Sequence, residues 1–121
     1  MLTRWLKGRK AEAAASSYLK KRGIKVIARN YRDRRGELDI IARENNQLCI
    51  VEVRSRGESS PYVPEASLSP SKVRHLSDTT SRFLKKHRLF HVPVRMDLLV
   101  IDWGRDEIRF YPGGIIPPPL R

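Results

Sequence analysis

Residues 37–54 read ELDIIARENNQLCIVEVR, with an apolar run on each side of a polar centre. β-Branched runs that flank a short polar turn are typical of a β-hairpin. Asn tolerates positive φ better than most residues, so we place a two-residue turn at Asn45 and Asn46. In this register Asp39 lies directly opposite Glu52.

Strand alternation divides this hairpin into a charged face and an apolar face. The charged face is predicted to carry Glu37, Asp39, Ile41, Ile50, Glu52 and Arg54. The apolar face is predicted to carry Leu38, Ile40, Ala42, Cys49, Val51 and Val53. Three acids and one base therefore meet at one end of the hairpin, with Glu37 opposite Arg54.

Two directly opposed carboxylates repel each other and destabilise a sheet, so the pair of Asp39 and Glu52 needs compensation. A shared proton, the Arg54 guanidinium or a divalent cation would each supply it. Carboxylate oxygens are ligands that suit Mg²⁺ or Mn²⁺, and the register therefore predicts a metal site. The alternative is a surface hairpin whose charges are solvated or paired with one another.

Composition predicts one folded domain that binds a polyanion. The chain has 121 residues, 40% of them hydrophobic, and a formal net charge of +12. Nucleic acid and an anionic membrane surface are the usual partners of so basic a domain. No apolar run approaches the ~20 residues of a spanning helix, and residues 1–7 are too short in their apolar part for a signal peptide. We therefore expect nucleic acid as the partner and no membrane.

The single cysteine, Cys49, falls in an apolar run and has no partner for a disulfide. A reducing compartment fits this usage, so we expect a cytoplasmic protein. The three histidines show no metal-ligand spacing.

Periodicity and turn signals predict an α+β domain with a mixed central sheet flanked by helices. The expected elements are a helix over 6–22, a strand over 24–31, the hairpin, a long loop over 55–68, a helix over 70–87 capped by Ser69, and strands over 94–103 and 108–111. We expect a single domain over 1–111 and a Pro/Gly-rich tail over 112–121 that is extended and poorly ordered.

Basic residues crowd the segment just before the hairpin, where four arginines lie within seven residues. This composition is typical of phosphate binding, and the alternative is a solvated basic loop. Lys72 lies in the first turn of the second helix, where a cation opposes the macrodipole and so favours an anion partner. The predicted nucleic-acid-binding residues are Arg32, Arg34, Arg35, Arg56 and Lys72.

Two motifs, Gly36-Glu37-Leu38-Asp39-Ile40-Ile41 and Val51-Glu52-Val53-Arg54-Ser55-Arg56, resemble those of the bacterial YraN family. Further matching positions are Gly8, Ala11, Glu12, Ala15, Leu19, Asn30-Tyr31-Arg32, Glu65-Ala66, Lys72, Arg95 and Asp97. The resemblance covers roughly residues 8–111. That family is in turn similar to the PD-(D/E)xK nuclease superfamily and to archaeal Holliday-junction resolvases, which share an αβββαβ core.

The resemblance implies a role for each acid of the predicted site. Asp39, Glu52 and Glu12 would be metal ligands, and Glu37 would be an extra acid or a partner of Arg54. The superfamily has a catalytic lysine where this chain has Arg54. Arginine cannot deprotonate, although its fixed charge can stabilise a developing anion. The substitution leaves metal binding in place and puts hydrolytic activity in question.

By resemblance we expect an endonuclease dependent on Mg²⁺ or Mn²⁺ that acts on branched or recombination and repair intermediates of DNA. Glu12, Glu37, Asp39, Glu52 and Arg54 would form its catalytic site, and a homodimer is expected by analogy with the resolvases. One alternative is a catalytically impaired nuclease-fold module that only binds DNA. Another is a basic RNA-associated domain, which does not explain the opposed carboxylates.

Overall fold

The computed structural model describes residues 3–57 and 60–118. The elements are α1 (Thr3–Lys21), β1 (Lys25–Arg32), β2 (Glu37–Glu44), β3 (Gln47–Arg56), η1 (Pro64–Ala66), α2 (Pro70–Lys86), β4 (Val94–Asp102) and β5 (Glu107–Tyr111). This is the expected order, with a 3₁₀ helix added inside the long loop. Three parts of the chain lie outside the described ranges: residues 1–2, residues 58–59 of the long loop, and residues 119–121 of the tail. No described helix is long and apolar enough to cross a membrane.

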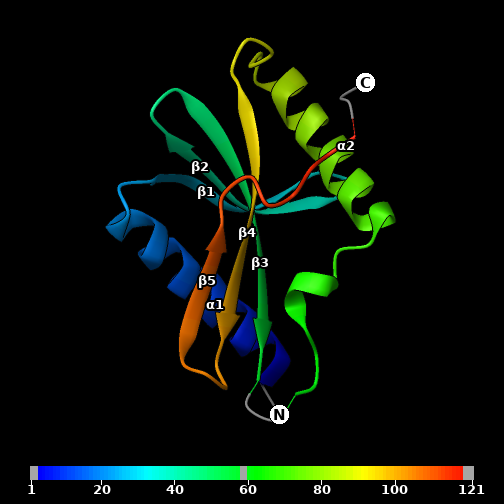
Figure 1. The fold of residues 1–121 in the computed structure, drawn as a ribbon. Coiled ribbons are helices and arrows are strands. Elements are labelled where there is room, and N and C mark those ends of the chain that lie inside the picture. The colour runs from blue at the N-terminus through cyan, green and yellow to red at the C-terminus, as the bar shows by residue number, and fades with distance from the viewer. Residues whose placement is uncertain (1–2, 58–59, 119–121) are drawn as a thin grey trace.

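The five strands form one mixed sheet in the order β1-β2-β3-β4-β5 (Figure 1). β3 and β4 are parallel, and the other neighbours are antiparallel. A parallel pair needs a crossover connection, and here η1 and α2 supply it. The fold class is therefore the mixed α+β architecture predicted from the sequence.

Each helix packs against its own set of sheet residues. The first cluster joins Leu76, Phe83 and Leu84 of α2 to buried residues of β2, β3 and β4 such as Ile50. The second joins Ala11, Ala15 and Leu19 of α1 to the other apolar residues of the same strands, such as Val51. The small alanines allow α1 to lie close to the sheet. Alternation along β4 is as predicted, because Met96, Leu98 and Val100 belong to the first cluster and Leu99 and Ile101 to the second.

The hairpin has the predicted turn and register over most of its length. Glu44 pairs with Gln47, and Asn45 adopts a φ of 54°. The predicted face of Leu38 is wrong, because Leu38 packs in the α2 cluster while Ile40 packs in the α1 cluster. Alternation along β2 is therefore interrupted between Leu38 and Ile40, where the pairing of β2 with β3 ends.

The beginning of the tail is packed, contrary to the expectation of poor order. Ile115 is buried, and its N–H donates to the carbonyl of Met96 at 3.2 Å. The N–H of Gly113 donates to Oδ1 of Asp97 at 2.7 Å. Asp97 is fully buried and also accepts two hydrogen bonds from Arg95, at 2.7 and 3.0 Å. These two residues, matched by the family resemblance, therefore hold the tail against β4.

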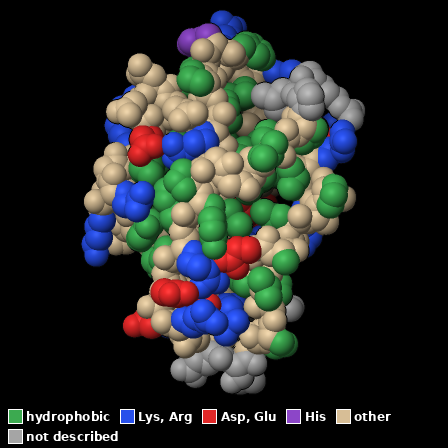
Figure 2. Space-filling view, in the orientation of Figure 1, with side chains coloured by type: hydrophobic (Ala, Val, Ile, Leu, Met, Phe, Trp, Pro, Cys, Tyr) green, Lys and Arg blue, Asp and Glu red, His purple; other side chains and the backbone are tan. Residues whose placement is uncertain are grey.

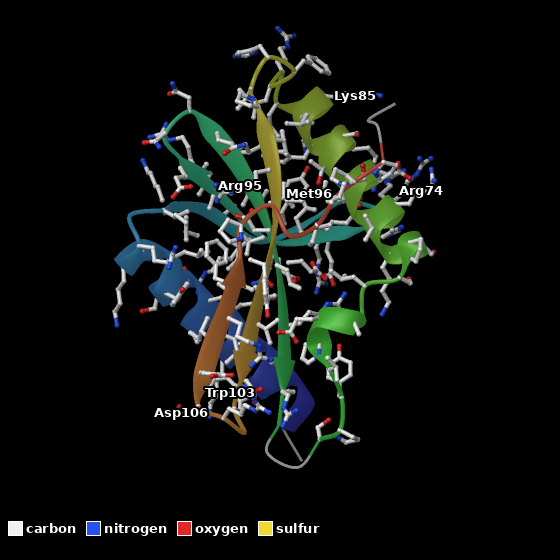
Figure 3. All side chains as sticks on the ribbon, in the orientation of Figure 1. Arg74, Lys85, Arg95, Met96, Trp103 and Asp106 are labelled. Carbon is white, nitrogen blue, oxygen red and sulfur yellow. The ribbon has the colours of Figure 1, made fainter. Side chains whose placement is uncertain are left out.

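Replacing Asp97 with Asn is expected to lower the free energy of unfolding by about 3 kcal/mol, because it leaves the Arg95 guanidinium without its buried counter-charge. Urea denaturation followed by circular dichroism measures this change. Asp106→Asn is the matched control, because Asp106 is exposed in the β4–β5 turn and Asn tolerates its φ of 50° (Figure 3). Equal stability of the two variants would contradict this role for Asp97.

Candidate active site

The predicted acids lie where β2 separates from β3. The pairing of these strands ends at Ile40 and Val51, one step before the expected opposition of Asp39 and Glu52. Beyond this fork β3 continues beside β4 as far as Arg56. The N–H of Val53 donates to Oδ2 of Asp39 at 2.9 Å. The Asp39 side chain therefore accepts this hydrogen bond in place of a backbone carbonyl of β2.

Asp39 and Glu52 nevertheless form a directly interacting pair of carboxyl groups. Burial and then the Asp39 carboxylate raise the pKa of Glu52 to about 8. Burial also raises the pKa of Asp39, against the opposing effect of the Val53 N–H. Two like charges in a poorly solvated site cannot both ionise at low cost, so the pair retains a proton at neutral pH.

The arginine of the motif neutralises Glu52 rather than Glu37. Nη2 of Arg54 lies 2.9 Å from Oε2 of Glu52, and both side chains are mostly buried. Glu37 instead pairs with Arg32 at 3.1 Å, and that pair is exposed. The opposition of Glu37 and Arg54 that the register predicted is therefore not formed, because β2 and β3 have already separated at this level.

Glu12 approaches the carboxyl pair from α1. Burial and then the charge of Asp39 raise the pKa of Glu12, while the Asn30 side chain opposes the shift. Glu12 is thus close enough to feel Asp39, as the first-helix acid was expected to be. Within the described ranges, however, no three His, Cys, Asp or Glu side chains are grouped closely enough to hold a metal ion. The expected set of three carboxylates is not assembled.

The donor chemistry of the pair still fits a hard cation. Asp39 and Glu52 offer carboxylate oxygens at a single point, and a divalent ion would displace their shared proton. A metal ion bound to these carboxylates would compete with Arg54, whose guanidinium already pairs with Glu52. Its Nε is one of two buried side-chain atoms without a hydrogen-bond partner in the described part of the chain. An unpaired buried donor is costly, and an anionic oxygen at the site would pair it.

A cleft of about 800 Å³ opens over this fork. Its lining comes from the end of β1, the β1–β2 loop, the fork itself and the first turns of α2. Six of the predicted residues line it: Arg32, Glu37, Asp39, Glu52, Arg54 and Lys72. The other lining residues are Asp33, Gly36, Leu68, Ser71, Arg74, His75, Leu76 and Asp78.

The arginine loop is held against α2 by an aspartate that the sequence analysis did not single out. Oδ1 of Asp33 accepts hydrogen bonds from the N–H groups of Arg35 and Gly36, at 2.8 and 2.9 Å. Arg82 of α2 donates to the same carboxylate at 2.7 and 3.3 Å, which holds the pKa of Asp33 well below its usual range. A Cβ at Gly36 would approach Oγ1 of Thr79 to 2.3 Å, so only glycine allows this close contact. Arg34 and Arg35 are left exposed at the rim of the cleft.

Arg56 lies apart from the cleft, in a second group of charges. Its Nε is 3.1 Å from Oδ1 of Asp102, whose side chain is almost fully buried. Arg109 donates to Asp102 at 3.0 Å and to Glu65 of η1 at 2.6 Å. Figure 2 shows the mixed acidic and basic side chains at this lower end of the molecule. Arg56 therefore helps to fix the long loop against β4 and β5, and its predicted contact with nucleic acid stays a prediction.

The sequence analysis missed the contribution of α2 beyond Lys72. Ser71, Arg74, His75 and Asp78 were not singled out as candidate site residues, yet they line the cleft. The signal was their helical spacing: Lys72, His75 and Asp78 follow one another at intervals of three, the spacing that puts residues on one side of a helix. What the sequence did not show is that this side faces the fork.

Comparison with known proteins identifies relatives along most of the chain. The profile of the group described as "Uncharacterised protein family UPF0102" matches residues 11–101. A UPF0102 protein of Persephonella marina is 40% identical over 97 residues, covering 80% of this chain and 84% of the relative. One from Lachnoclostridium phytofermentans is 38% identical over 105 residues, covering 86% and 87%. One from Legionella pneumophila is 37% identical over 103 residues, covering 84% and 87%.

The carboxyl pair predicts a pH-dependent stability. Because the pKa of Glu52 is about 8 in the folded chain and near 4.5 in an ordinary glutamate, the folded chain binds more protons between these values. The free energy of unfolding should therefore fall as pH rises from 5 to 8. Relative to Glu52→Gln, the fall should be on the order of 3 kcal/mol, because a tenfold difference in proton affinity between the folded and unfolded chains corresponds to about 1.4 kcal/mol.

Urea denaturation in EDTA at several pH values measures this dependence for both proteins. Asp106→Asn serves as the control and should follow the native profile, because the side chain is exposed and distant from the fork. Parallel profiles for the native chain and Glu52→Gln would show that Glu52 carries no such proton.

Proposed function

We propose that this chain, which belongs to the UPF0102 family, binds nucleic acid and hydrolyses DNA phosphodiesters with the help of Mg²⁺ or Mn²⁺. The observation that carries the proposal is the half-buried, interacting pair of Asp39 and Glu52 at the floor of a cleft whose walls carry cations. A pair of acids with raised pKa values in a cleft is typical of a functional site. The resemblance to nucleases of the PD-(D/E)xK type favours branched or repair intermediates as substrates.

In this proposal Asp39 and Glu52 hold the metal, and Glu12 completes the ligand set through a shift of its side chain. The bound metal would supply Lewis-acid stabilisation of the phosphate and lower the pKa of an attacking water. The Val53 N–H fixes the orientation of Asp39 through its 2.9 Å hydrogen bond. Arg54 reaches Glu52 with one nitrogen and keeps Nε free for an oxygen of the phosphate.

Arg54 is also the basis of the second candidate function, a nuclease-fold module that binds DNA without cleaving it. Its guanidinium already neutralises Glu52 at 2.9 Å, which removes much of the negative potential that would attract a metal. Arginine also cannot donate or accept a proton in the reaction as a lysine can. Both candidates bind DNA, and they differ in whether the carboxyl pair supports turnover.

End-labelled four-way junction, flap, single-stranded and linear duplex DNA, incubated with the protein in Mn²⁺, Mg²⁺ or EDTA, separate the two functions. We expect metal-dependent cleavage that falls by at least ~100-fold in Asp39→Asn, because the metal loses a ligand. Arg54→Lys should retain or increase the rate, and Asp106→Asn should leave it unchanged. Gel electrophoresis of the products measures all four.

Cleavage by Arg54→Lys alone, with none by the native chain, would assign this chain to the binding-module function. Cleavage that persists in EDTA or in Asp39→Asn would contradict the proposed site and indicate a contaminating nuclease.

DNA binding should depend steeply on salt under either function, because exposed arginines and lysines release counterions when they contact phosphates. Fluorescence anisotropy with labelled duplex in EDTA, between 50 and 200 mM NaCl, measures the slope. Arg34→Ala together with Arg35→Ala should reduce the slope by about 1.8, which is about 0.9 for each lost contact with duplex. A flat dependence would contradict a role in phosphate binding.

A further inference from the structure

The cations of the cleft fall into two classes that the sequence does not distinguish. Arg32 and Arg54 line the cleft but are paired with Glu37 and Glu52. Lys72 and Arg74 line the opposite wall, on α2, and within the described residues no carboxylate lies within ion-pair distance of either. Among the residues that the structure describes, the one polar contact of the Lys72 ammonium is the carbonyl of Ser67 at 3.5 Å. The α2 wall, which also carries the Asp78 carboxylate, therefore supplies the two cations of the cleft lining that have no carboxylate partner among the described residues.

The cleft also offers a small apolar surface next to this charge. Leu68, which is half-buried, lines the cleft beside Lys72 and Arg74, whereas Leu76 beneath it belongs to the buried core. In a duplex, the base faces are stacked inside, and the outer surface consists of the two sugar-phosphate backbones and the groove edges of the bases. A single strand exposes its base faces as well, so its phosphates can contact cations while a base contacts a neighbouring side chain such as Leu68.

Arg34 and Arg35 occupy a different position. Both are exposed. They lie in the chain between Asp33 and Gly36, which line the cleft, but they do not line it themselves. The Asp33 hydrogen bonds and the Arg82 ion pair hold this loop in place. A polyanion too wide for a cleft of about 800 Å³ would meet these two arginines at the rim.

We propose that the cleft is a binding site for single-stranded DNA, in which Lys72 and Arg74 contact consecutive phosphates of the strand that lies over the carboxyl pair. Duplex DNA is held outside, at the rim, by Arg34 and Arg35. The inference rests on the proposed function, and it specifies the form of the substrate: DNA in which a single strand leaves a duplex. Neither Arg74 nor this division of roles was predicted from the sequence.

The test compares two pairs of cations on the same helix. Lys72→Ala with Arg74→Ala removes two charges at the cleft, and Lys85→Ala with Lys86→Ala removes two from the last turn of α2. Figure 3 shows Arg74 and Lys85 at separate levels of the helix. Thirteen residues separate Lys72 from Lys85, which is about 20 Å at 1.5 Å per residue and about twice the screening length at 0.1 M salt. The variants therefore match in charge and differ in position.

Anisotropy titrations in EDTA, with a labelled 20-nucleotide strand and with the same strand in a duplex, measure binding without cleavage. The cleft variant should lose at least ~10-fold in affinity for the single strand, and its salt slope should fall by about 1.4, from two contacts of about 0.7 each. Its affinity for duplex should change by less than ~3-fold. The Lys85 and Lys86 variant should change by less than ~3-fold on both ligands, and Arg34→Ala with Arg35→Ala should weaken duplex binding most.

Equal losses on both ligands, or an equal loss in the Lys85 and Lys86 variant, would overturn the single-strand site. These results would leave the proposed nuclease function standing, because that function is tested separately by cleavage. Absence of binding to either ligand by the native chain would overturn both. Thermal unfolding of each variant checks that a loss of affinity does not result from unfolding. The substituted side chains on α2, Lys72, Arg74, Lys85 and Lys86, are all exposed, so we expect each variant to remain folded.

Discussion

The hydrogen bond from the Val53 N–H to Asp39 joins β2 to β3 at the point where their pairing stops. Beyond it, β3 stays with β4 while the start of β2 turns toward α2. The opening between these two directions is the cleft, and the acids lie at its floor because they are the first residues past the last paired step. One side-chain contact thus closes the fork and sets the position of the carboxyl pair.

Charge compensation around the fork is local. Arg54 lies against Glu52, Arg32 against Glu37 and Arg82 against Asp33, so three of the five acids that line the cleft have a basic partner. Asp39 instead accepts the Val53 N–H and interacts with Glu52. The large excess of lysine and arginine over acid is therefore carried by residues without such partners. Among those at the cleft are Lys72 and Arg74, and at its rim Arg34 and Arg35. The net charge of +12 indicates a polyanionic partner, and the ion pairs indicate which cations are available to it.

Local signals predicted most of the fold, and long-range contacts explain where prediction failed. The Asn45-Asn46 turn fixed the hairpin register because turn chemistry is local, and Ser69 capped α2 through the Lys72 N–H as expected. The face of Leu38 was wrong because strict alternation was extended past Ile40, where the pairing of β2 with β3 already ends. The contact between Asp33 and Arg82 spans 49 residues, and no periodicity in the sequence indicates it. The packed tail depends in the same way on Asp97, which the sequence placed correctly in β4 without revealing its partners.

The parallel pairing of β3 with β4 has a consequence for how the chain folds. β1, β2 and β3 are neighbours in sequence and form a meander through short turns, whereas Leu48 meets Val94 only after η1 and α2 have crossed the sheet. Non-local pairing carries a larger loop-closure entropy and is slow to form. The hairpin should therefore bring Asp39 and Glu52 together before α2 closes over them. We therefore expect the acidic floor to form before its cationic wall, and the docking of the crossover to be the slower step.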